Sequence, residues 1–483
     1  MTETVYSSLI YPRLKDRVKL RKHKDYVLVY DLKIALHDLI HPSQAIFLAL
    51  CSGGLSIQQI EYLVGETYRL SPEETKKLIE TYLKRSMPFL DLLDNPDPIA
   101  SIRYDVKQFF YNIDSEKWYS DYDQPVPVPM GINLIPSYKC NFKCRYCYQN
   151  VSNHGHEKMD LSTCIRLVQE AAEWGVAYVG LSGGEPTLFD GWTILLKEIL
   201  KLGMNPVITT NGFVIGNNPD IAKYLKAIGL NEITVSLDAS NPKLHHYITR
   251  SSNTFSKVID AIIALIDSDL RVLMKCVLTR DNMEDIGNLI ELLVKLGVSE
   301  IGISRCEAGA IGSFANLTPP LSSREVDIAC ENVEAKREKY RGICDIHPPR
   351  NIKCQWNENS WYPCGGLYTG MAILPTGKVS VCEKLGEDTP FIYGDVFKNS
   401  LREIWNGVDF QRLRDRATDI NVVDTKCSQC SKLKLCRTSC FVDSLQACGN
   451  YFAKHPLCGG PFKALNGGEK FSEQEANTLG RRQ

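Results

Sequence analysis

Three closely spaced cysteines are the side chains of this sequence best suited to chemistry. Cys140, Cys144 and Cys147 stand in the segment C-N-F-K-C-R-Y-C-Y, at gaps of three and two residues. Three such thiolates can hold one iron–sulfur cluster and leave its fourth iron without a protein ligand. An open coordination position is where a metal centre reacts, whereas structural metal sites are closed. A zinc knuckle, or a chance cluster in a chain with 18 cysteines, is the alternative.

A second set of cysteines lies toward the C-terminus and is too large for one zinc ion. Its members are Cys364, Cys382, Cys427, Cys430, Cys436, Cys440 and Cys458, and the central four read C-x2-C-x5-C-x3-C. A zinc ribbon uses only four ligands and leaves the others unexplained. In a reducing compartment, grouped cysteines are better interpreted as metal ligands than as disulfides.

Composition restricts the classes of function. Lys plus Arg number 56 and Asp plus Glu 57, so there is no net basic charge of the kind that attracts nucleic acid. The N-terminus M-T-E-T-V-Y-S-S lacks a secretory signal, and the most apolar helical run is interrupted by Asp267 and Asp269. We therefore expect a cytoplasmic protein that binds neither nucleic acid nor membrane.

Six short apolar runs alternate with amphipathic helical patterns in the middle of the chain. The runs begin near residues 132, 177, 206, 232, 272 and 300. Such alternation predicts a parallel βα fold, either an open sheet or an incomplete barrel, whose chemistry lies at the carboxyl ends of the strands. The cysteine triplet directly follows the first run.

The N-terminal region predicts a smaller unit of a different class. The strand-like segment Asp25–Asp31 precedes three helical patterns at 42–50, 56–68 and 71–86, and Ser71 with Glu74 has the spacing of a capping box. One strand with three short helices indicates a winged-helix-like α+β module. A Pro-containing segment ending in Q-P-V-P-V-P separates it from the βα region.

The second predicted strand ends in L-S-G-G-E-P-T. Gly183 and Gly184 permit close backbone approach, Glu185 can accept from an ammonium group, and Pro186 stiffens the turn. An ordinary βα turn is the alternative. Together with the cysteine triplet, this motif resembles the radical S-adenosylmethionine superfamily.

That resemblance implies a [4Fe–4S] cluster on the cysteine triplet, with S-adenosylmethionine completing its open iron and supplying a 5′-deoxyadenosyl radical. It implies a partial (β/α)6 barrel of the TIM type. The cofactor-binding positions that it implies are Tyr146, Gly183, Gly184, Glu185, Ser236 and Arg250. Arg250 is not followed by the glycine usual in relatives, and solvated or structural roles stay open for Ser236, Asp238 and Arg250.

The C-terminal cysteines resemble the SPASM extension of that superfamily, which holds two auxiliary [4Fe–4S] clusters. The resemblance implies one cluster on Cys364, Cys382 and Cys440, with Cys354 as the candidate fourth ligand and Cys344 in reserve. It implies a second cluster on Cys427, Cys430, Cys436 and Cys458.

The N-terminal unit resembles the leader-peptide recognition (PqqD-like) domain of ribosomal-peptide maturases, which captures an extended leader by strand addition. A winged-helix DNA binder is the alternative, although the third helix mixes acidic and basic residues. The expected domains are 1–95 for leader recognition, 96–130 for the linker, 131–317 for the barrel, 318–460 for SPASM, and 461–483 for a polar tail.

These resemblances predict a radical S-adenosylmethionine enzyme that modifies a ribosomally made precursor peptide. An oxidative thioether or carbon–carbon crosslink is expected, with Asp238 or Glu307 as candidate base and an external one-electron donor of the flavodoxin or ferredoxin type. Oxidation of a single protein residue and excision of peptide backbone are alternatives. An iron–sulfur electron-transfer or scaffold protein, and a DNA-binding redox regulator, are the alternatives from other classes.

Overall fold

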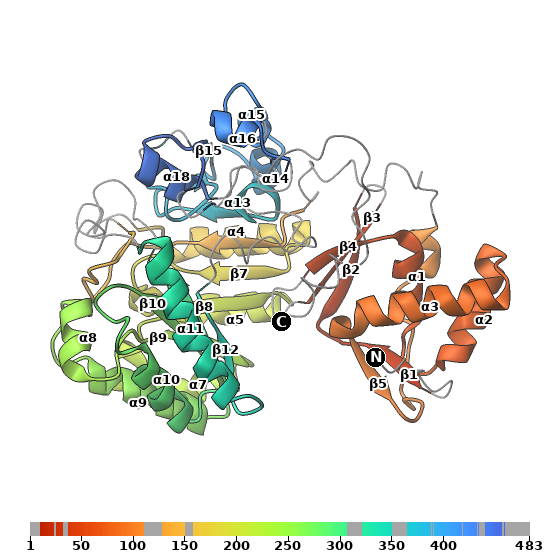
Figure 1. Ribbon diagram of the computed structural model, residues 1–483, viewed down its shortest axis with the longest axis horizontal. Helices are drawn as coiled ribbons and strands as arrows, with labels where there is room; N and C mark the ends of the chain where they lie inside the picture. Colours follow the sequence, from red (N-terminus) through yellow and green to blue (C-terminus); the bar gives the residue numbers. More distant parts are fainter. Residues whose placement is uncertain are drawn as a thin grey trace. The chain divides into compact units, whose positions relative to one another are not determined.

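The chain divides into two compact units, residues 1–127 and 128–483, each of which is described by itself (Figure 1). The computed structural model describes residues 10–23, 26–31, 37–110, 128–149, 158–306, 321–349, 365–387, 389, 391–417, 419–431, 433, 440–455 and 458.

The first unit combines two small antiparallel sheets with three helices. Strands β2 (Val18–His23), β3 (Tyr26–Asp31) and β4 (His37–Ile40) form one sheet in that order, and β1 (Tyr11–Leu14) pairs with β5 (Leu90–Leu93) in the other. The helices are α1 (Pro42–Leu50), α2 (Ile57–Tyr68) and α3 (Pro72–Ser86). The three predicted helices are therefore present.

The helix boundaries of this unit follow from local sequence. Ser56 and Ser71 each form a capping box, accepting from the backbone N–H three residues later while Gln59 or Glu74 bonds back to the cap. Proline occupies the first turn of α1 and of α3, where its missing N–H costs nothing.

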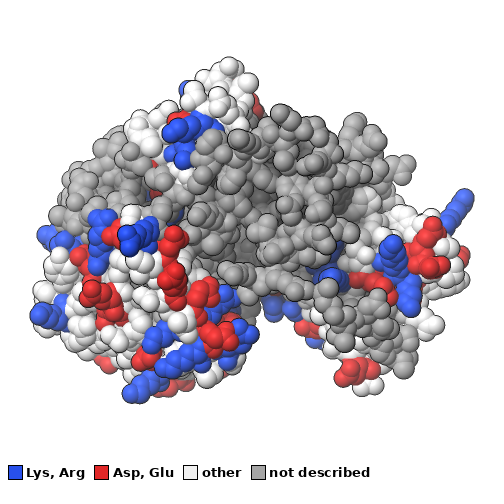
Figure 2. Space-filling model, viewed as in Figure 1, with Lys and Arg blue, Asp and Glu red and all other residues white. Residues whose placement is uncertain are grey.

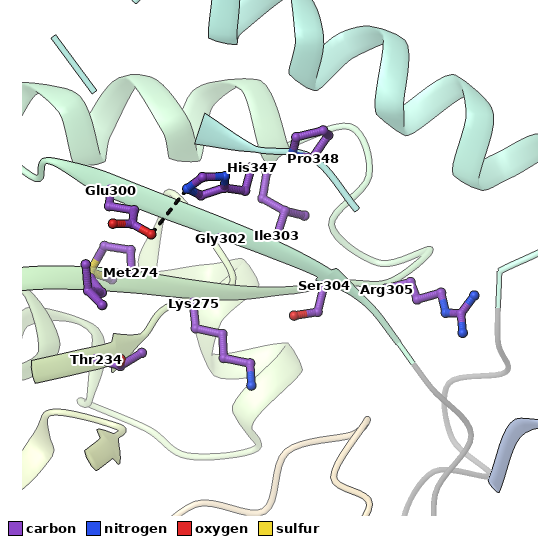
Figure 3. Close-up of a pocket in the computed structure, with 11 residues that line it drawn as sticks. Thr234, Met274, Lys275, Glu300, Gly302, Ile303, Ser304, Arg305, His347 and Pro348 are labelled. Atoms are coloured by element: carbon purple, nitrogen blue, oxygen red, sulfur yellow. Dashed lines mark ion pairs between the residues drawn. The ribbon is translucent and has the colours of Figure 1, made fainter. Parts of the chain in front are cut away.

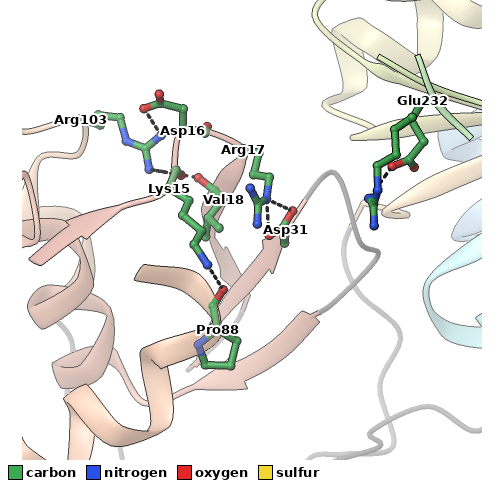
Figure 4. A network of polar contacts seen from close by, with 9 residues as sticks. Lys15, Asp16, Arg17, Val18, Asp31, Pro88, Arg103 and Glu232 are labelled. Carbon is green, nitrogen blue, oxygen red and sulfur yellow. Dashed lines mark hydrogen bonds and ion pairs between the residues drawn. The ribbon is translucent and has the colours of Figure 1, made fainter. Parts of the chain in front are cut away.

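This unit extends beyond the predicted boundary at residue 95. Phe109, in the short 3-10 helix η2 (Val106–Phe109), is buried in the same core as α1–α3, and Tyr104 packs against that core. Arg103 donates to the backbone oxygens of Asp16, Lys15 and Val18, which fastens this segment to the β1–β2 turn (Figure 4). The segment after residue 95 is mostly polar, so these few apolar core residues were not recognised from the sequence.

The second unit is built on a ten-stranded, mostly parallel sheet with the order β12-β11-β10-β9-β8-β7-β6-β13-β14-β15. The six predicted strands are present as β6 (Gly131–Leu134), β7 (Tyr178–Leu181), β8 (Asn205–Thr210), β9 (Glu232–Ser236), β10 (Arg271–Leu278) and β11 (Glu300–Arg305). They are neighbours in chain order and parallel.

Two further parallel pairings enlarge this sheet. β12 (Asp345–His347) joins β11 at one end, and β13 (Gly370–Ile373) joins β6, continuing into the antiparallel strands β14 (Lys378–Ser380) and β15 (Ile392–Asp395). Part of the region expected to be an independent cysteine-rich domain therefore completes the same sheet. Three- and four-residue strands carry too little periodicity to be found from sequence.

Helices join the strands and cover one face of the sheet. They are α4 (Leu161–Trp174), α5 (Trp192–Lys201), α6 (Phe213–Asn217), α7 (Asp220–Ala227), α8 (Pro242–Thr249), α9 (Phe255–Asp267), α10 (Ile286–Lys295) and α11 (Ser323–Lys339). On β10, Val272, Met274, Cys276 and Leu278 are buried, while the alternate residue Lys275 is exposed. One face thus forms the core and the other carries polar residues.

The described part of the C-terminal region adds five short helices, namely α13 (Gly365–Tyr368), α14 (Leu401–Trp405), α15 (Val408–Arg416), α16 (Thr425–Ser428) and α18 (Phe441–Cys448). The buried Arg414 guanidinium lies 3.7 Å from the centroid of Phe410 and 4.6 Å from that of Trp405, and it donates to the carbonyl of Leu367. Aromatic and cation–π packing therefore joins α15 to α13 and α14.

Surface charge is mixed in the view of Figure 2, where acidic and basic side chains alternate over the described part of the surface shown. Within the described residues, no helix combines the length and the apolar character needed to span a bilayer.

Candidate active site

The cysteine triplet lies in the loop that leaves the carboxyl end of β6. Two backbone hydrogen bonds hold this loop against the end of α8, from Lys143 N to Thr249 O at 3.0 Å and from Arg145 N to Ile248 O at 2.9 Å. A third, from Cys147 N to Cys144 O at 3.1 Å, closes a turn inside the loop. These backbone hydrogen bonds of the protein itself therefore hold the conformation of the loop that carries the cysteines.

Phe142 attaches the same loop to the neighbouring helices. Its ring is buried and meets Phe213 and His245 edge-on, at centroid distances of 6.2 and 6.0 Å. The buried His245 ring also meets Phe255 at 5.6 Å, and its Nε2 lies 3.0 Å from Oγ1 of Thr254. The phenylalanine between the first two cysteines is therefore the loop's attachment to α6, α8 and α9.

The Gly183–Gly184 turn packs directly on the start of the cysteine loop. Gly184 N donates to Ser137 O at 3.1 Å, and Glu185 N donates to Lys139 O at 2.8 Å. A Cβ on Gly184 would lie 2.2 Å from Lys139 O, and Gly183 adopts a φ of +123°. Only glycine fits both positions, because backbone occupies the space that a side chain would need.

The carboxylate of Glu185 is buried and already has four protein donors. Oε1 accepts from Thr187 N, from Thr187 Oγ1 and from Thr210 Oγ1, and Oε2 accepts from Asn211 N at 2.7 Å. Burial raises the pKa of Glu185, and these donors oppose the increase. This carboxylate ties the turn to β8, while the predicted contact of Glu185 with an amino group stays a prediction.

Asp238, the second residue after β9, contacts the cysteine loop. Tyr146 donates its hydroxyl to Oδ2 at 2.5 Å, and Val277 N donates to Oδ1 at 2.7 Å. Burial raises the pKa of Asp238 to about 6, against the lowering effect of its hydrogen bonds to Tyr146 and Val277. Two predicted site residues that are 92 positions apart in sequence therefore meet side chain to side chain.

The three cysteines lie on one loop, and each is partly exposed. Desolvation raises the pKa of Cys140 to about 12 and that of Cys147 to about 11, and desolvation with neighbouring negative charge, including that of Cys140 and Cys147, raises the pKa of Cys144 well above its ordinary value. Among the described residues no three His, Cys, Asp or Glu side chains are drawn together tightly enough to hold a single metal ion. The fit to an iron–sulfur cluster therefore rests on the donor set, three thiols on one loop, which is the ligand type that such clusters use.

The other predicted residues occupy different places. Ser236 ends β9 at the same carboxyl edge and pairs in register with Lys275. Arg250 is the C-cap of α8 in the left-handed conformation, with φ 52°, directly after the residues that bind the cysteine loop. Glu307, Cys354, Cys364 and Cys436 lie outside the described residues.

The described C-terminal cysteines expected as ligands are Cys382, Cys427, Cys430, Cys440 and Cys458. The charges of Cys430 and Cys458 act on Cys427, and the charge of Cys440 acts on Lys384, whose backbone N donates to Cys382 Sγ at 3.5 Å. The division of these cysteines into two auxiliary sets stays a prediction. The reserve ligand Cys344 instead precedes β12, at the amino edge of the sheet.

One hydrogen bond connects the cysteine loop to the segment that contains Cys382. Tyr148, next to Cys147, donates its hydroxyl to Oε1 of Glu383 at 2.7 Å, and Glu383 is next to Cys382. Gln149 Nε2 donates to Glu383 O at 3.4 Å. Sequence reasoning missed Glu383 and His245, because neither belongs to a recognisable motif and both depend on contacts with the distant cysteine loop.

Comparisons with known proteins agree with this geometry. Residues 134–293 match the family model of the radical SAM superfamily, and residues 364–431 match that of an iron–sulfur cluster-binding domain. A PqqA peptide cyclase of Ruegeria pomeroyi is 28% identical over 346 residues, covering 70% of this chain and 88% of the relative.

Among solved structures, Streptococcus suis SuiB bound to S-adenosylmethionine matches with a TM-score of 0.68 at 16% identity, and SuiB bound to its precursor peptide SuiA with 0.67 at 17% identity. Each covers 93% of this chain and 100% of the other, so the likeness of fold includes the N-terminal unit.

The two matched domains imply [4Fe–4S] clusters and S-adenosylmethionine as cofactors. Cys140, Cys144 and Cys147 lie inside the first matched region, and Cys382, Cys427 and Cys430 lie inside the second. With its cysteine loop, its glycine turn and both matches in agreement, the chain is an enzyme of the radical S-adenosylmethionine type that carries an iron–sulfur cluster-binding domain after its parallel strands.

Proposed function

We propose that this enzyme modifies a ribosomally made precursor peptide, whose leader binds the first unit and whose core is crosslinked oxidatively at the carboxyl edge of the parallel sheet. The observation that carries the proposal is the combination of a cysteine loop and glycine turn with a separate N-terminal unit. Its relatives include PqqA peptide cyclases, and its fold is that of SuiB, which is solved with a precursor peptide.

The first unit supports strand addition as the way of holding the leader. In the sheet order β2-β3-β4, β2 and β4 each have a single neighbour among the described strands, so each lies at an edge of the sheet. An extended peptide can pair with such an edge, and side-chain pockets along it then supply selectivity. This is the arrangement expected of a PqqD-like recognition domain.

The chemistry would be divided between cofactor and protein. A [4Fe–4S] cluster with bound S-adenosylmethionine supplies, on one-electron reduction, a 5′-deoxyadenosyl radical that abstracts hydrogen from a substrate. Cys140, Cys144 and Cys147 would hold that cluster. Tyr146, the Gly183–Gly184 turn, Ser236 and Arg250 would orient the nucleoside at the mouth of a partial barrel.

The C-terminal cysteines would make the net reaction oxidative. A crosslink leaves the peptide with fewer hydrogens, so an electron must leave the substrate after hydrogen abstraction. Auxiliary clusters on the Cys382–Cys440 and Cys427–Cys430–Cys458 groups would accept it, and an external one-electron donor of the flavodoxin or ferredoxin type would reduce the first cluster.

The test is anaerobic turnover of the reconstituted full chain with dithionite and S-adenosylmethionine. We expect release of 5′-deoxyadenosine, and loss of about four irons per chain together with that release when Cys144 is replaced by Ala. Cys448→Ser is the matched control, because Cys448 is exposed and outside every proposed ligand set. No 5′-deoxyadenosine from fully reconstituted wild type would favour a scaffold or electron-transfer role instead.

The peptide part needs a second measurement. Short open reading frames beside the gene would be expressed with the enzyme, and their peptides examined by mass spectrometry. A loss of 2 Da per crosslink, from two hydrogens of about 1 Da each, is the expected product signature. Unchanged masses for every neighbouring peptide, with 5′-deoxyadenosine release intact, would remove the peptide substrate and leave the radical chemistry standing.

A further inference from the structure

We infer that Lys275 is the recognition group for an acidic side chain of the substrate, in a pocket on the face of β9, β10 and β11 that the described helices leave uncovered. The inference rests on the proposed peptide-modifying function and names a chemical requirement on its substrate. It depends on three observations: a cavity, a lysine with no ion-pair partner among the described residues, and a described lining that is otherwise neutral or internally balanced.

The pocket has a volume of ≈ 350 Å³ and lies along three neighbouring strands. Thr234, Lys275 and Ser304 line it from β9, β10 and β11 respectively. Figure 3 shows that the side chains of Lys275 and Ser304 extend to the same side of their strands. A cavity of this size with a few convergent polar groups has the dimensions of a small-ligand or side-chain site.

The strand register explains why these groups converge. Lys275 pairs with Ser236 on one side and with Gly302 on the other, so no large neighbour covers its base. Gly302 has only one atom, Met274 O at 3.7 Å, near the place a Cβ would take. Helices bury the alternate residues Met274 and Cys276 of the same strand. Lys275 is therefore the charged group at the centre of the uncovered face.

The charge of Lys275 is not compensated among the described residues. No described carboxylate lies within 4.0 Å of its ammonium group, and the side chain itself is exposed. Glu300, the carboxylate that lines the pocket, is paired with Arg271 and with His347, the latter at 3.2 Å. Asp238 interacts electrostatically with the lysine, and its oxygens accept from Tyr146 and Val277.

The other positively charged side chains near the pocket have acidic groups beside them. Arg305 forms an ion pair with Asp443, which also bonds His455 at 2.8 Å. Arg305 Nη1 and Asp443 Oδ1 are both buried and have no hydrogen-bond partner among the described residues. Lys384 faces Cys440 and Asp443. Lys275 is thus the charge that remains for a ligand.

The preferred ligand group is a carboxylate, because an ammonium group with an adjacent hydroxyl forms charge-assisted hydrogen bonds to it. Two sources could supply that carboxylate: an Asp or Glu of the peptide, or the methionine moiety of S-adenosylmethionine. The extent of the pocket favours the peptide, because the pocket follows β11 from Glu300 to Arg305 and reaches His347 and Pro348, which is more space than one amino-acid carboxylate fills.

The experiment uses the full reconstituted chain with S-adenosylmethionine present. Equilibrium dialysis measures the affinity for a capped five-residue peptide with a central glutamate, and for its glutamine counterpart. We expect wild type to prefer the glutamate peptide about tenfold at low salt, Lys275→Met to lose that preference, and Lys275→Arg to keep it. Lys197→Met, an exposed lysine of α5 outside the pocket, is the matched control and should keep the preference.

Three outcomes would overturn the inference. These are equal affinity of wild type for the two peptides, retention of the preference by Lys275→Met, and a loss of S-adenosylmethionine affinity in Lys275→Met as large as the loss of peptide affinity. The last would assign the lysine to the nucleoside instead. Release of 5′-deoxyadenosine without peptide is measured on the same samples. Its absence would count against the proposed function, whereas a failed peptide preference with normal release counts only against Lys275.

Discussion

The hydroxyl of Tyr146 lies 2.5 Å from Oδ2 of Asp238, and this contact joins the cysteine loop to the end of β9. Asp238 is itself fixed by Val277 N and, through its backbone oxygen, by Asn282 Nδ2 at 2.9 Å. The aromatic residue between the second and third cysteines is therefore held in place by a carboxylate that β9 and β10 position. The loop geometry depends on the sheet and not only on the metal.

Replacing Tyr146 with Phe should make the cluster easier to remove. The change leaves one oxygen of a buried carboxylate without its donor, which costs about 1–3 kcal/mol. We expect iron release to a chelator to be several-fold faster in Tyr146→Phe under anaerobic conditions. Tyr247→Phe is the control, since Tyr247 is exposed and packs its ring, rather than its hydroxyl, on Arg145 at 4.4 Å. Equal release rates in the two variants would show that the hydroxyl does not stabilise the loop.

Replacing Gly184 with Ala should disrupt the site although it adds only one methyl group. The new Cβ would lie 2.2 Å from Lys139 O and 2.4 Å from Tyr138 O, and backbone atoms cannot move aside as a side chain can. We expect at least tenfold weaker S-adenosylmethionine binding, about 1.4 kcal/mol or more, measured by equilibrium dialysis on reconstituted protein. Gly386→Ala is the matched control, because nothing lies within 4 Å of its Cβ position. Normal binding by Gly184→Ala would contradict the close packing of turn and loop.

Replacing Glu383 with Gln should shift the reduction potential of the auxiliary cluster next to Cys382. Reduction adds negative charge to a cluster, so removing a neighbouring carboxylate favours the reduced form. The shift should be positive and on the order of 100 mV, as expected for a unit charge several Å away at an effective dielectric constant of about 20. A redox titration followed by electron paramagnetic resonance measures it. The exposed Glu334→Gln should leave all potentials unchanged, and a negative shift in Glu383→Gln would refute the assignment.

His245 should make the second unit less stable in weak acid. Burial lowers the pKa of His245 to about 4, from 6.5 in an unfolded chain, so between these values the unfolded state binds the extra proton and stability falls as pH falls. Between pH 7.5 and 5 this residue alone should cost about 2 kcal/mol of unfolding free energy. Chemical denaturation of wild type and His245→Gln measures it, with the exposed His246→Gln as control. An identical pH slope in wild type and His245→Gln would disprove the effect.

The sequence by itself determined the parts of the site that are local in the chain. Cysteine spacing, the Gly183–Gly184 turn and the alternation of six apolar runs with helices each occupy a few consecutive residues, and each has a physical meaning that needs no distant contact. The helices of the first unit were equally local, because capping boxes at Ser56 and Ser71 and the prolines at 42 and 72 mark where they begin. The structure contains these predicted elements, and only their end residues differ slightly from the prediction.

Only the tertiary structure decided which of these groups meet. The side chain of Asp238 holds Tyr146, and the oxygens of Glu185 accept from Thr187, Thr210 and Asn211. The predicted roles of Asp238 as a base and of Glu185 as a cofactor contact stay predictions. Strands β12 and β13 extend the sheet from a region expected to be separate. Such pairings join residues up to several hundred positions apart, and local propensity carries no information on them, because their energy comes from burial and hydrogen bonds that exist only once the sheet has formed.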